Sequence, residues 1–312
     1  MTLRLGYLLP TRERIMAGIH ETRQILNLAD HAETIGIDSL WIGDSLLAKP
    51  RHEPLTLLSA LSGRTKKIKL GTAVLLPMLR NPVLLAHQIA TIDQISEGRL
   101  IVGTGTARDV PAIRNEFQAA GVALEKRIGT MLEQIKLCRS LWTGDEINWQ
   151  GRWIVNQAEL APKPYTPGGP PIWGGGGVTA ALKRTAQYFN GWFPSGPGDG
   201  HDWGKAWVQL KKYTQDAGRN QSEITGAAYV TLAINEDKNK ADEELNLYLK
   251  NYYKLPAQQI RDQQYCFAGE RNAAIEWLNL FVQAGATHIC VRFTGNKDEK
   301  QMEELAKMRE QW

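Results

Sequence analysis

Cysteine is scarce in this sequence. Three cysteines occur among 312 residues, at Cys138, Cys266 and Cys290. Their number is odd, they lie far apart and no two of them form a CxxC pair, so a disulfide framework is excluded. We therefore expect a protein of a reducing compartment, the cytoplasm.

Long apolar runs are also missing. No stretch approaches the roughly 18 uninterrupted apolar residues that a membrane-spanning helix needs. The opening segment, MTLRLGYLLPTRERIM, has no small-residue cleavage site and is interpreted as a first strand rather than a signal peptide. We expect no association with a membrane.

Strong charge and metal-binding patterns are absent as well. The net charge is +4, which suits a small anionic ligand but is too weak and dispersed for nucleic-acid binding. The six histidines show no metal-ligand spacing, so we expect no metal site. No GxGxxG follows a predicted strand, which argues against a built-in nicotinamide site.

What the sequence does contain is a regular alternation of strand-like and helix-like segments. Eight short apolar segments are predicted strands: 3–9, 38–43, 67–76, 99–105, 170–175, 191–195, 224–235 and 287–293. Helical periodicity follows at about 21–35, 54–65, 82–96, 124–141, from 178, at 202–217, 241–250 and 272–284, and in a last amphipathic segment. This alternation of strands and helices is interrupted once. Around Gln150-Gly151 polar and apolar residues alternate one by one, which indicates an inserted β-hairpin.

This pattern predicts an α/β fold, a single (β/α)8 TIM-type barrel over residues 1–312. The insertion spans about 106–161. A doubly wound open sheet is the alternative, which eight units disfavour. Barrel enzymes work at the C-terminal ends of their strands. The candidate site residues are therefore those that directly follow the strands: Pro10–Arg12, Asp44-Ser45, Leu75–Pro77, Thr104–Arg108, Gly174–Gly177, Ser195–Gly198, Asn235 and Arg292.

Four consecutive glycines, Gly174–Gly177, stand between a predicted strand and a predicted helix. Glycine is costly to order, so such a run indicates a tight left-handed turn or the close approach of a ligand. Phosphate and similar anions are the usual ligands at the start of a helix. Both interpretations stay open on the residues alone.

Several segments resemble the bacterial luciferase-like flavin-dependent oxidoreductases. They are GIDSLWIGDSLL, LEKRIGTMLEQIKLCRSLW, PPIWGGGGVTAALKRTAQYFNGWF and, most specifically, KLGTAVLLPMLRNPVLLAHQIATIDQISEGRLIVGTG. The resemblance implies a (β/α)8 barrel that binds reduced FMN, or in one branch the deazaflavin coenzyme F420, at the C-terminal end of the strands.

The resemblance also assigns cofactor contacts. Gly174, Gly175, Gly176, Gly177 and Val178 would hold the flavin phosphate at a helix start. Ser195 would reach the same phosphate. Lys183-Arg184 lie one turn further on, where they would suit the acidic tail of the deazaflavin or merely face solvent.

Other positions would contact the ring. The bond matching Ala73–Val74 is a non-proline cis peptide in several family members and lies against the isoalloxazine. Thr104, Gly105 and Thr106 would line the ring edge, and Arg127 stands where luciferase has a phosphate-contacting arginine. Arg127 has an alternative partner in Glu133.

The segment WIGDSLL departs from the family. Many members carry a histidine after the acidic residue that ends the second strand, whereas here Asp44 is followed by Ser45. Both are candidate catalytic residues, although serine is a poor general base at neutral pH. Asp44 has the alternative of capping a helix or pairing with an arginine. The aromatic stretch Tyr248–Pro256 covers the substrate side or forms a helix packing face.

The resemblance implies an oxidoreductase, in first place a two-component monooxygenase. It would take reduced FMN from a separate NAD(P)H-dependent flavin reductase and use O₂ to oxygenate a small organic substrate. The main alternative is an F420-dependent dehydrogenase or reductase that transfers hydride. A flavin-binding protein without turnover and a barrel isomerase or lyase acting on a phosphorylated substrate are further alternatives. A homodimer through the early helices is expected by resemblance.

Overall fold

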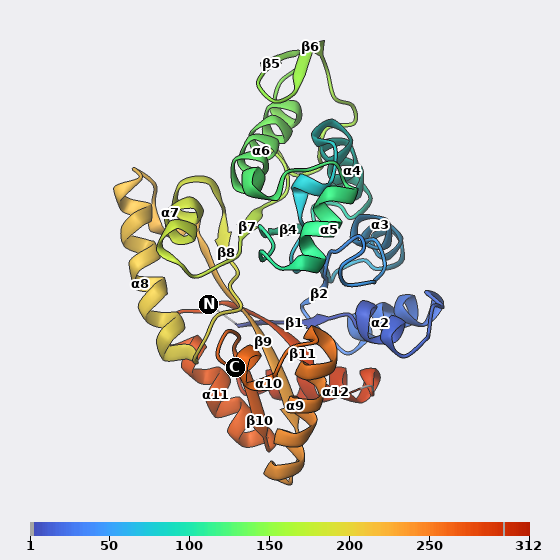
Figure 1. The fold of residues 1–312 in the computed structure, drawn as a ribbon, viewed down its shortest axis with the longest axis vertical. Coiled ribbons are helices and arrows are strands. Elements are labelled where there is room, and N and C mark those ends of the chain that lie inside the picture. Colours follow the sequence, from blue (N-terminus) through green and yellow to red (C-terminus); the bar gives the residue numbers. More distant parts are fainter. Residues whose placement is uncertain (1–2, 296) are drawn as a thin grey trace.

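The computed structural model describes residues 3–295 and 297–312, and its core is a closed parallel barrel of eight strands (Figure 1). The strands follow one another around the barrel in the order β1 (Arg4–Leu8), β2 (Ser39–Ile42), β3 (Lys69–Thr72), β4 (Leu100–Thr104), β7 (Ile172–Gly174), β8 (Gly191–Trp192), β9 (Thr225–Ile234) and β11 (His288–Phe293). The ring closes because β11 pairs with β1 and β8 pairs with β9. The predicted barrel is confirmed, and the open-sheet alternative is wrong.

Every predicted helix is present, with ends shifted by a few residues. These helices are α2 (Arg23–Thr34), α3 (Pro54–Arg64), α4 (Pro82–Ile95), α6 (Arg127–Thr143), α7 (Thr179–Tyr188), α8 (Gly200–Asp216), α9 (Lys238–Tyr253), α11 (Arg271–Gln283) and α12 (Asp298–Arg309). Their boundaries follow ordinary end signals. For example, Pro54 and Pro82 open α3 and α4 directly after the side-chain caps Glu53 and Asn81.

Some short elements were not expected. They are α1 (Thr11–Met16), α5 (Pro111–Ala119), α10 (Ala257–Arg261) and β10 (Cys266–Gly269), besides three single-turn 3-10 segments: Pro77–Leu79, Leu124–Lys126 and Gln221–Glu223. Segments this short carry too few residues for a period to stand out. β10 pairs with the far half of β9, from Thr231 to Ile234, and so extends the sheet beyond the barrel.

The inserted hairpin is present as predicted. β5 (Ile147–Gln150) and β6 (Ile154–Ala158) pair antiparallel, with Trp149 opposite Val155. The hairpin stands at the end of α6, away from the barrel strands (Figure 1). It therefore does not contribute to the barrel sheet.

The barrel interior is filled by aromatic side chains. The indole of Trp41 lies 5.4 Å from that of Trp173 and 4.6 Å from the ring of Phe193, measured between centroids. The ring of His288 stands edge-on to both indoles, and its Nε2 lies 2.7 Å from the Ser39 hydroxyl. Because this interior is a packed core, ligands must bind at its rim.

In the described part of the chain, no helix combines the length and the apolarity that crossing a membrane requires.

Candidate functional site

The four glycines lie where β7 ends and α7 begins, at the C-terminal rim of the barrel. Gly174 is required for packing, because a Cβ there would lie 2.6 Å from the Thr185 hydroxyl and also collide with the ring of Phe189. Gly176 is required for conformation, since its φ is +91°. A Cβ at Gly177 would meet nothing within 4 Å. Packing and turn geometry therefore explain Gly174 and Gly176, but neither explains why a glycine stands at position 177.

The start of α7 has the properties of an anion site. Its N-cap residue is Val178, a poor cap that makes no side-chain hydrogen bond, and Val178 is 72% exposed. The glycines before it keep the approach to the first turn open. Backbone N–H groups at such a start favour negative charge. The loop therefore fits a phosphate group, as the resemblance implied.

A non-proline cis peptide joins Ala73 to Val74, directly after β3. The resemblance implied this bond, and the structure contains it. Both side chains are half-buried and pack on the aromatic barrel core, at the C-terminal end of β3. A Cβ at Gly105 would collide with the Val74 side chain, so Gly105 leaves the space that Val74 occupies. The two apolar side chains form a surface on which a planar ring can lie.

Thr104 connects these two parts of the rim. Its hydroxyl donates to the Trp173 carbonyl at 3.1 Å, and its own carbonyl accepts the Gly175 N–H at 2.9 Å. Thr104 therefore fixes the end of β4 to the end of β7, and its hydroxyl is occupied within the sheet. Thr106 and Ser195 lie half-buried on the same rim. Their contacts with a cofactor remain predictions.

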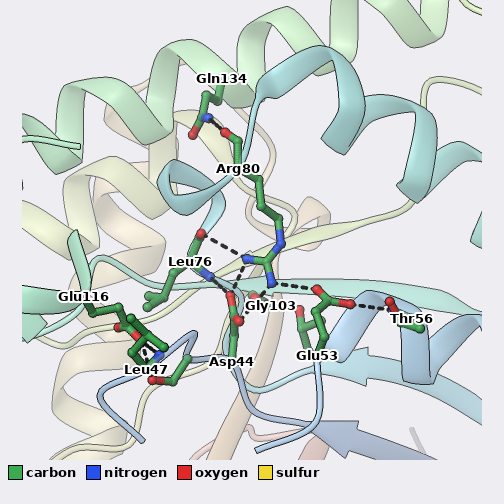
Figure 2. Close-up of polar contacts among 11 residues, drawn as sticks. Asp44, Leu47, Glu53, Thr56, Leu76, Arg80, Gly103, Glu116 and Gln134 are labelled. Carbon is green, nitrogen blue, oxygen red and sulfur yellow. Dashed lines mark hydrogen bonds and ion pairs between the residues drawn. The ribbon is translucent and has the colours of Figure 1, made fainter. Parts of the chain in front are cut away.

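Asp44 belongs to a buried ion-pair network (Figure 2). The Arg80 guanidinium donates to both of its carboxylate oxygens, at 2.6 and 3.0 Å, and the Leu76 N–H donates to one of them at 2.9 Å. The second arm of Arg80 reaches Glu53 at 2.7 Å. Burial raises the pKa of Glu53, but the Thr56 N–H and Arg80 outweigh it and lower that pKa. The structure thus contains the alternative in which Asp44 pairs with an arginine.

Ser45 is held by a glutamate that the sequence did not single out. Its hydroxyl donates to Glu116 Oε1 at 2.6 Å, and it accepts the Lys49 N–H at 2.9 Å. The same Glu116 oxygen accepts from the N–H groups of Leu47 and Ala48, while Oε2 is buried without a partner. These contacts fix the loop after β2.

Arg127 begins α6. Its Nη1 donates to the Leu124 carbonyl at 2.8 Å and its Nε is buried without a partner. Glu133, its alternative partner, instead forms an ion pair with Arg152 of the hairpin turn. A phosphate contact by Arg127 stays a prediction.

A group of cations and tyrosines, here called the cation–tyrosine cluster, lies at the same end of the barrel. It contains Arg12, Lys49, Arg51 and Arg292, together with Tyr229, Tyr248, Tyr252 and Tyr253. Arg292 points inward from β11, donates twice to Thr231 Oγ1 and lies against all four tyrosine rings. The aromatic face of α9 therefore packs over this end of the barrel, as the helix-packing expectation for Tyr248–Pro256 has it, and a contact with the substrate stays a prediction.

Burial and mutual repulsion shape the electrostatics of the cluster. Burial lowers the pKa of Lys49 to about 8, with Tyr253 opposing this effect and Arg51 adding to it. Burial raises the pKa of Tyr253, but Arg292 and Lys49 outweigh it, so that pKa is lowered. The cluster is a strongly positive environment.

The sequence had named Arg12 and Arg292 as rim residues, but it missed the rest of the cluster. Lys49 and Arg51 lie a few residues beyond Asp44-Ser45, in the same loop after β2, so extending the rim rule along that loop would have found them. Glu116 and Arg80 left no local signal, because their partners are 71 and 36 residues away.

A cavity of about 760 Å³ lies outside the barrel mouth. It is lined by outward-facing residues of β9 and β11, such as Leu232 and Phe293, and by residues of α1, α9 and α12. It does not include the glycine loop or the Ala73–Val74 peptide. In the described residues, no group of three or more His, Cys, Asp or Glu side chains is placed to hold a metal ion.

Comparison with known proteins identifies the family. The sequence model of the luciferase-like monooxygenases matches residues 3–291. The chain belongs to this family. Among solved structures, it is similar to an F420-dependent secondary alcohol dehydrogenase in complex with an F420–acetone adduct (TM-score 0.83, 20% identity, 99% of this chain and 98% of that one). It is also similar to the monooxygenase RslO1 from Streptomyces bottropensis (TM-score 0.82, 19% identity, 98% of each chain). At these identities the likeness establishes the shared fold.

Curated relatives are more informative about the cofactor. An F420-dependent glucose-6-phosphate dehydrogenase from Amycolatopsis mediterranei is 26% identical over 309 residues, covering 89% of this chain and 90% of the relative. One of the same name from Mycolicibacterium fortuitum is 25% identical over 332 residues, covering 98% and 96%. These names support the coarser expectation of an oxidoreductase.

They also correct two expectations. The expected main function, a two-component monooxygenase, and its expected cofactor, reduced FMN, are wrong, because relatives that cover 89–98% of this chain are named as F420-dependent dehydrogenases. The resemblance did not separate the two cofactors, because it implied the same end of the barrel for both. The deazaflavin alternative is the one that these findings favour.

Proposed function

We propose that this protein is an F420-dependent oxidoreductase, a dehydrogenase or reductase that exchanges a hydride with a small organic substrate. The observation that carries the proposal is the match to F420-dependent dehydrogenases over about nine tenths of both chains. When bound, coenzyme F420 supplies a deazaflavin ring that accepts or gives a hydride. A separate flavin reductase depended on the FMN interpretation and is not part of this proposal.

The chain offers residues that fit this cofactor. The open position at Gly177 and the uncapped start of α7 would hold the phosphate. The apolar side chains of Ala73 and Val74 would support the ring. Lys183 and Arg184 give weaker support, because the Lys183 ammonium already lies over the Tyr213 ring at 5.3 Å. The packed aromatic core beneath the rim would keep water from the inner face of the ring.

The proton that accompanies hydride transfer has no carrier at the positions named from the sequence. Asp44 is bound to Arg80, and the Ser45 hydroxyl donates to Glu116. We therefore assign both residues to holding the loops that carry the site. A proton carrier is sought among the groups that face the mouth, of which Lys49 and Tyr253 have shifted pKa values.

Anaerobic titration of the purified protein with coenzyme F420 and, separately, with FMN tests the proposal. We expect saturable binding of F420, followed by its fluorescence, and much weaker binding of FMN. The proposal fails if FMN binds tightly and F420 does not. Binding of F420 without any hydride transfer to or from a panel of alcohols and aldehydes would instead favour a binding protein without turnover.

A further inference from the structure

The cation–tyrosine cluster contains four cations and no paired carboxylate. In residues 3–295 and 297–312, none of Arg12, Lys49, Arg51 and Arg292 takes part in a salt bridge, although other arginines of the chain do. Glu13 accepts a hydrogen bond from the Tyr248 hydroxyl, and its charge acts on Arg12 and Arg51 without forming a salt bridge to either. The positive charge of the cluster is therefore balanced only in part.

Burial makes the excess of positive charge in the cluster unfavourable. Arg292 is 2% exposed and Arg12 is 6% exposed. A buried charge is normally paired with an opposite charge, because it has lost its hydration. Contact with tyrosine faces restores only part of what that hydration supplied. A negative group bound at the cluster would complete the pairing.

Arg12 has unused hydrogen-bonding capacity. Its Nη2 donates to the Tyr252 carbonyl at 3.0 Å, while its Nε and Nη1 are buried without any partner. A buried guanidinium with two unmatched nitrogens leaves charged donors for phosphate or carboxylate oxygens. An anion bound there would satisfy the donors and the charge together.

The position of the cluster relates it to the cofactor. β1 and β7 lie four strands apart around the barrel in either direction, so Arg12 and the glycine loop lie on opposite sides of the mouth. The Arg51 guanidinium occupies the space where a Cβ of Gly43 would be, and that position is 3.5 Å from the Ala73 carbonyl oxygen. One edge of the cluster is therefore next to the surface on which the ring would lie.

We propose that the cation–tyrosine cluster binds the phosphate or carboxylate group of the substrate, with Arg12 and Arg51 as its principal donors. This rests on the proposed function for the identity of the bound molecule, not for the anion site itself. A substrate held by its anion at Arg12 and Arg51 would extend its remaining atoms toward Ala73–Val74, where hydride exchange would take place. The cofactor phosphate would lie across the mouth, so the two anions would not compete.

Binding of inorganic phosphate and of malonate to the cofactor-free protein tests the site directly. Thermal unfolding is followed against ligand concentration at constant ionic strength, with chloride as the reference ion. We expect phosphate or malonate to raise the unfolding midpoint well beyond chloride, and Arg12→Gln and Arg51→Gln each to weaken this binding at least tenfold. Arg64→Gln is the matched control, because Arg64 is an exposed arginine paired with Asp30. It should bind like the wild type.

A second pair of variants separates the two anion sites. Gly177→Asp places a negative charge in the glycine loop and should weaken F420 binding while leaving the cluster's phosphate binding unchanged. Arg12→Gln and Arg51→Gln should show the reverse. If these arginine variants lose F420 instead, the anion belongs to the cofactor and the substrate assignment is wrong.

Two further results would overturn the proposal. One is a wild-type protein that distinguishes neither phosphate nor malonate from chloride. The other is phosphate binding that survives in Arg12→Gln and Arg51→Gln when each is combined with Gly177→Asp, which removes the glycine loop as a second phosphate site. Should either glutamine variant fail to fold, Arg12→Lys and Arg51→Lys retain the charge, and they should weaken anion binding less than tenfold. Because these assays contain no F420, they remain informative even if the proposed function fails.

Discussion

Arg292 Nη1 donates a hydrogen bond of 2.9 Å to the Tyr253 hydroxyl, and Tyr253 in turn donates to Gln264 at 3.1 Å. Arg292 is an inward-facing residue of the last barrel strand, and Tyr253 is the last residue of α9. The bond therefore links the barrel to the segment that covers its mouth. Arg292 Nη2 also reaches Gln264, so the three side chains form a closed set of contacts.

Replacing Tyr253 by Phe removes both hydrogen bonds. We expect the free energy of unfolding to fall by about 1–3 kcal/mol, because an Arg292 donor is left buried without its partner. Urea unfolding measures this, with Tyr213→Phe on α8 as the control. An unchanged stability would mean that this contact does not anchor α9.

The Asp44–Arg80 pair gives a second prediction. Asp44→Asn should lower stability by about 1–3 kcal/mol, because it weakens buried charged hydrogen bonds to Arg80, which keeps Glu53 as its other partner. Asp109→Asn is the comparison, since Asp109 pairs with Arg114 at the surface and its replacement should change stability much less than Asp44→Asn does. Equal effects of the two substitutions would contradict the structural role of Asp44.

His288 predicts a specific dependence of stability on pH. Burial, with Arg4 adding to it, lowers the pKa of His288 to about 3, whereas the unfolded chain has an ordinary value near 6.5. Below about pH 6.5 the unfolded state therefore binds a proton that the folded state does not, and stability falls as pH falls toward 3. At pH 5 this contribution is about 2 kcal/mol.

Comparing variants at pH 7 and pH 5 isolates this effect. His288→Gln should lose stability at pH 7, because it disturbs the barrel interior, but should show less further loss between pH 7 and pH 5 than the wild type. His87 is exposed on α4, so His87→Gln should follow the wild-type profile. A His288→Gln protein with the full wild-type pH dependence would refute the assignment.

Substitutions at Gly177 distinguish a glycine kept for ligand binding from a glycine kept for the turn. Gly177→Ala adds only a Cβ in open space and should change F420 affinity less than threefold, whereas Gly177→Asp should reduce it at least tenfold by repelling the phosphate. Both variants should unfold at the wild-type midpoint. If Gly177→Asp binds F420 normally, the phosphate lies elsewhere.

The barrel could be predicted from the sequence because each strand and helix has its own local periodicity and end signals. Strand 69–72 and helix 54–64, for instance, have the right period and are bounded by Pro54 and by Thr65. The glycine loop and the cis peptide were predicted for a different reason, because they lie in segments that resemble a family. Neither source reveals long-range pairing. The sequence identified Asp44 as a rim residue. Its ion pair with Arg80 could not be predicted, because it forms only when the loops after β2 and β3 meet in space.

The cofactor could not be chosen from these residues for a related physical reason. The phosphate recognition predicted for Gly174–Gly177 would use backbone N–H groups, which carry no information about the ring attached to the phosphate. Discrimination between a flavin and a deazaflavin must come from side chains around the ring and the tail. Those side chains are spread over several loops, and no spacing marks them.

β9 is ten residues long, and its two halves have different neighbours. Along one edge β11 pairs with Ala227 to Leu232, whereas along the other edge β8 pairs at Thr225 and Gly226 and β10 pairs from Thr231 to Ile234. The chain between β9 and β10, which includes α9, thus leaves and re-enters the same sheet at adjacent strands. The segment supplies none of the hydrogen bonds that pair the eight barrel strands with one another, so its side chains can change while that strand pairing is kept.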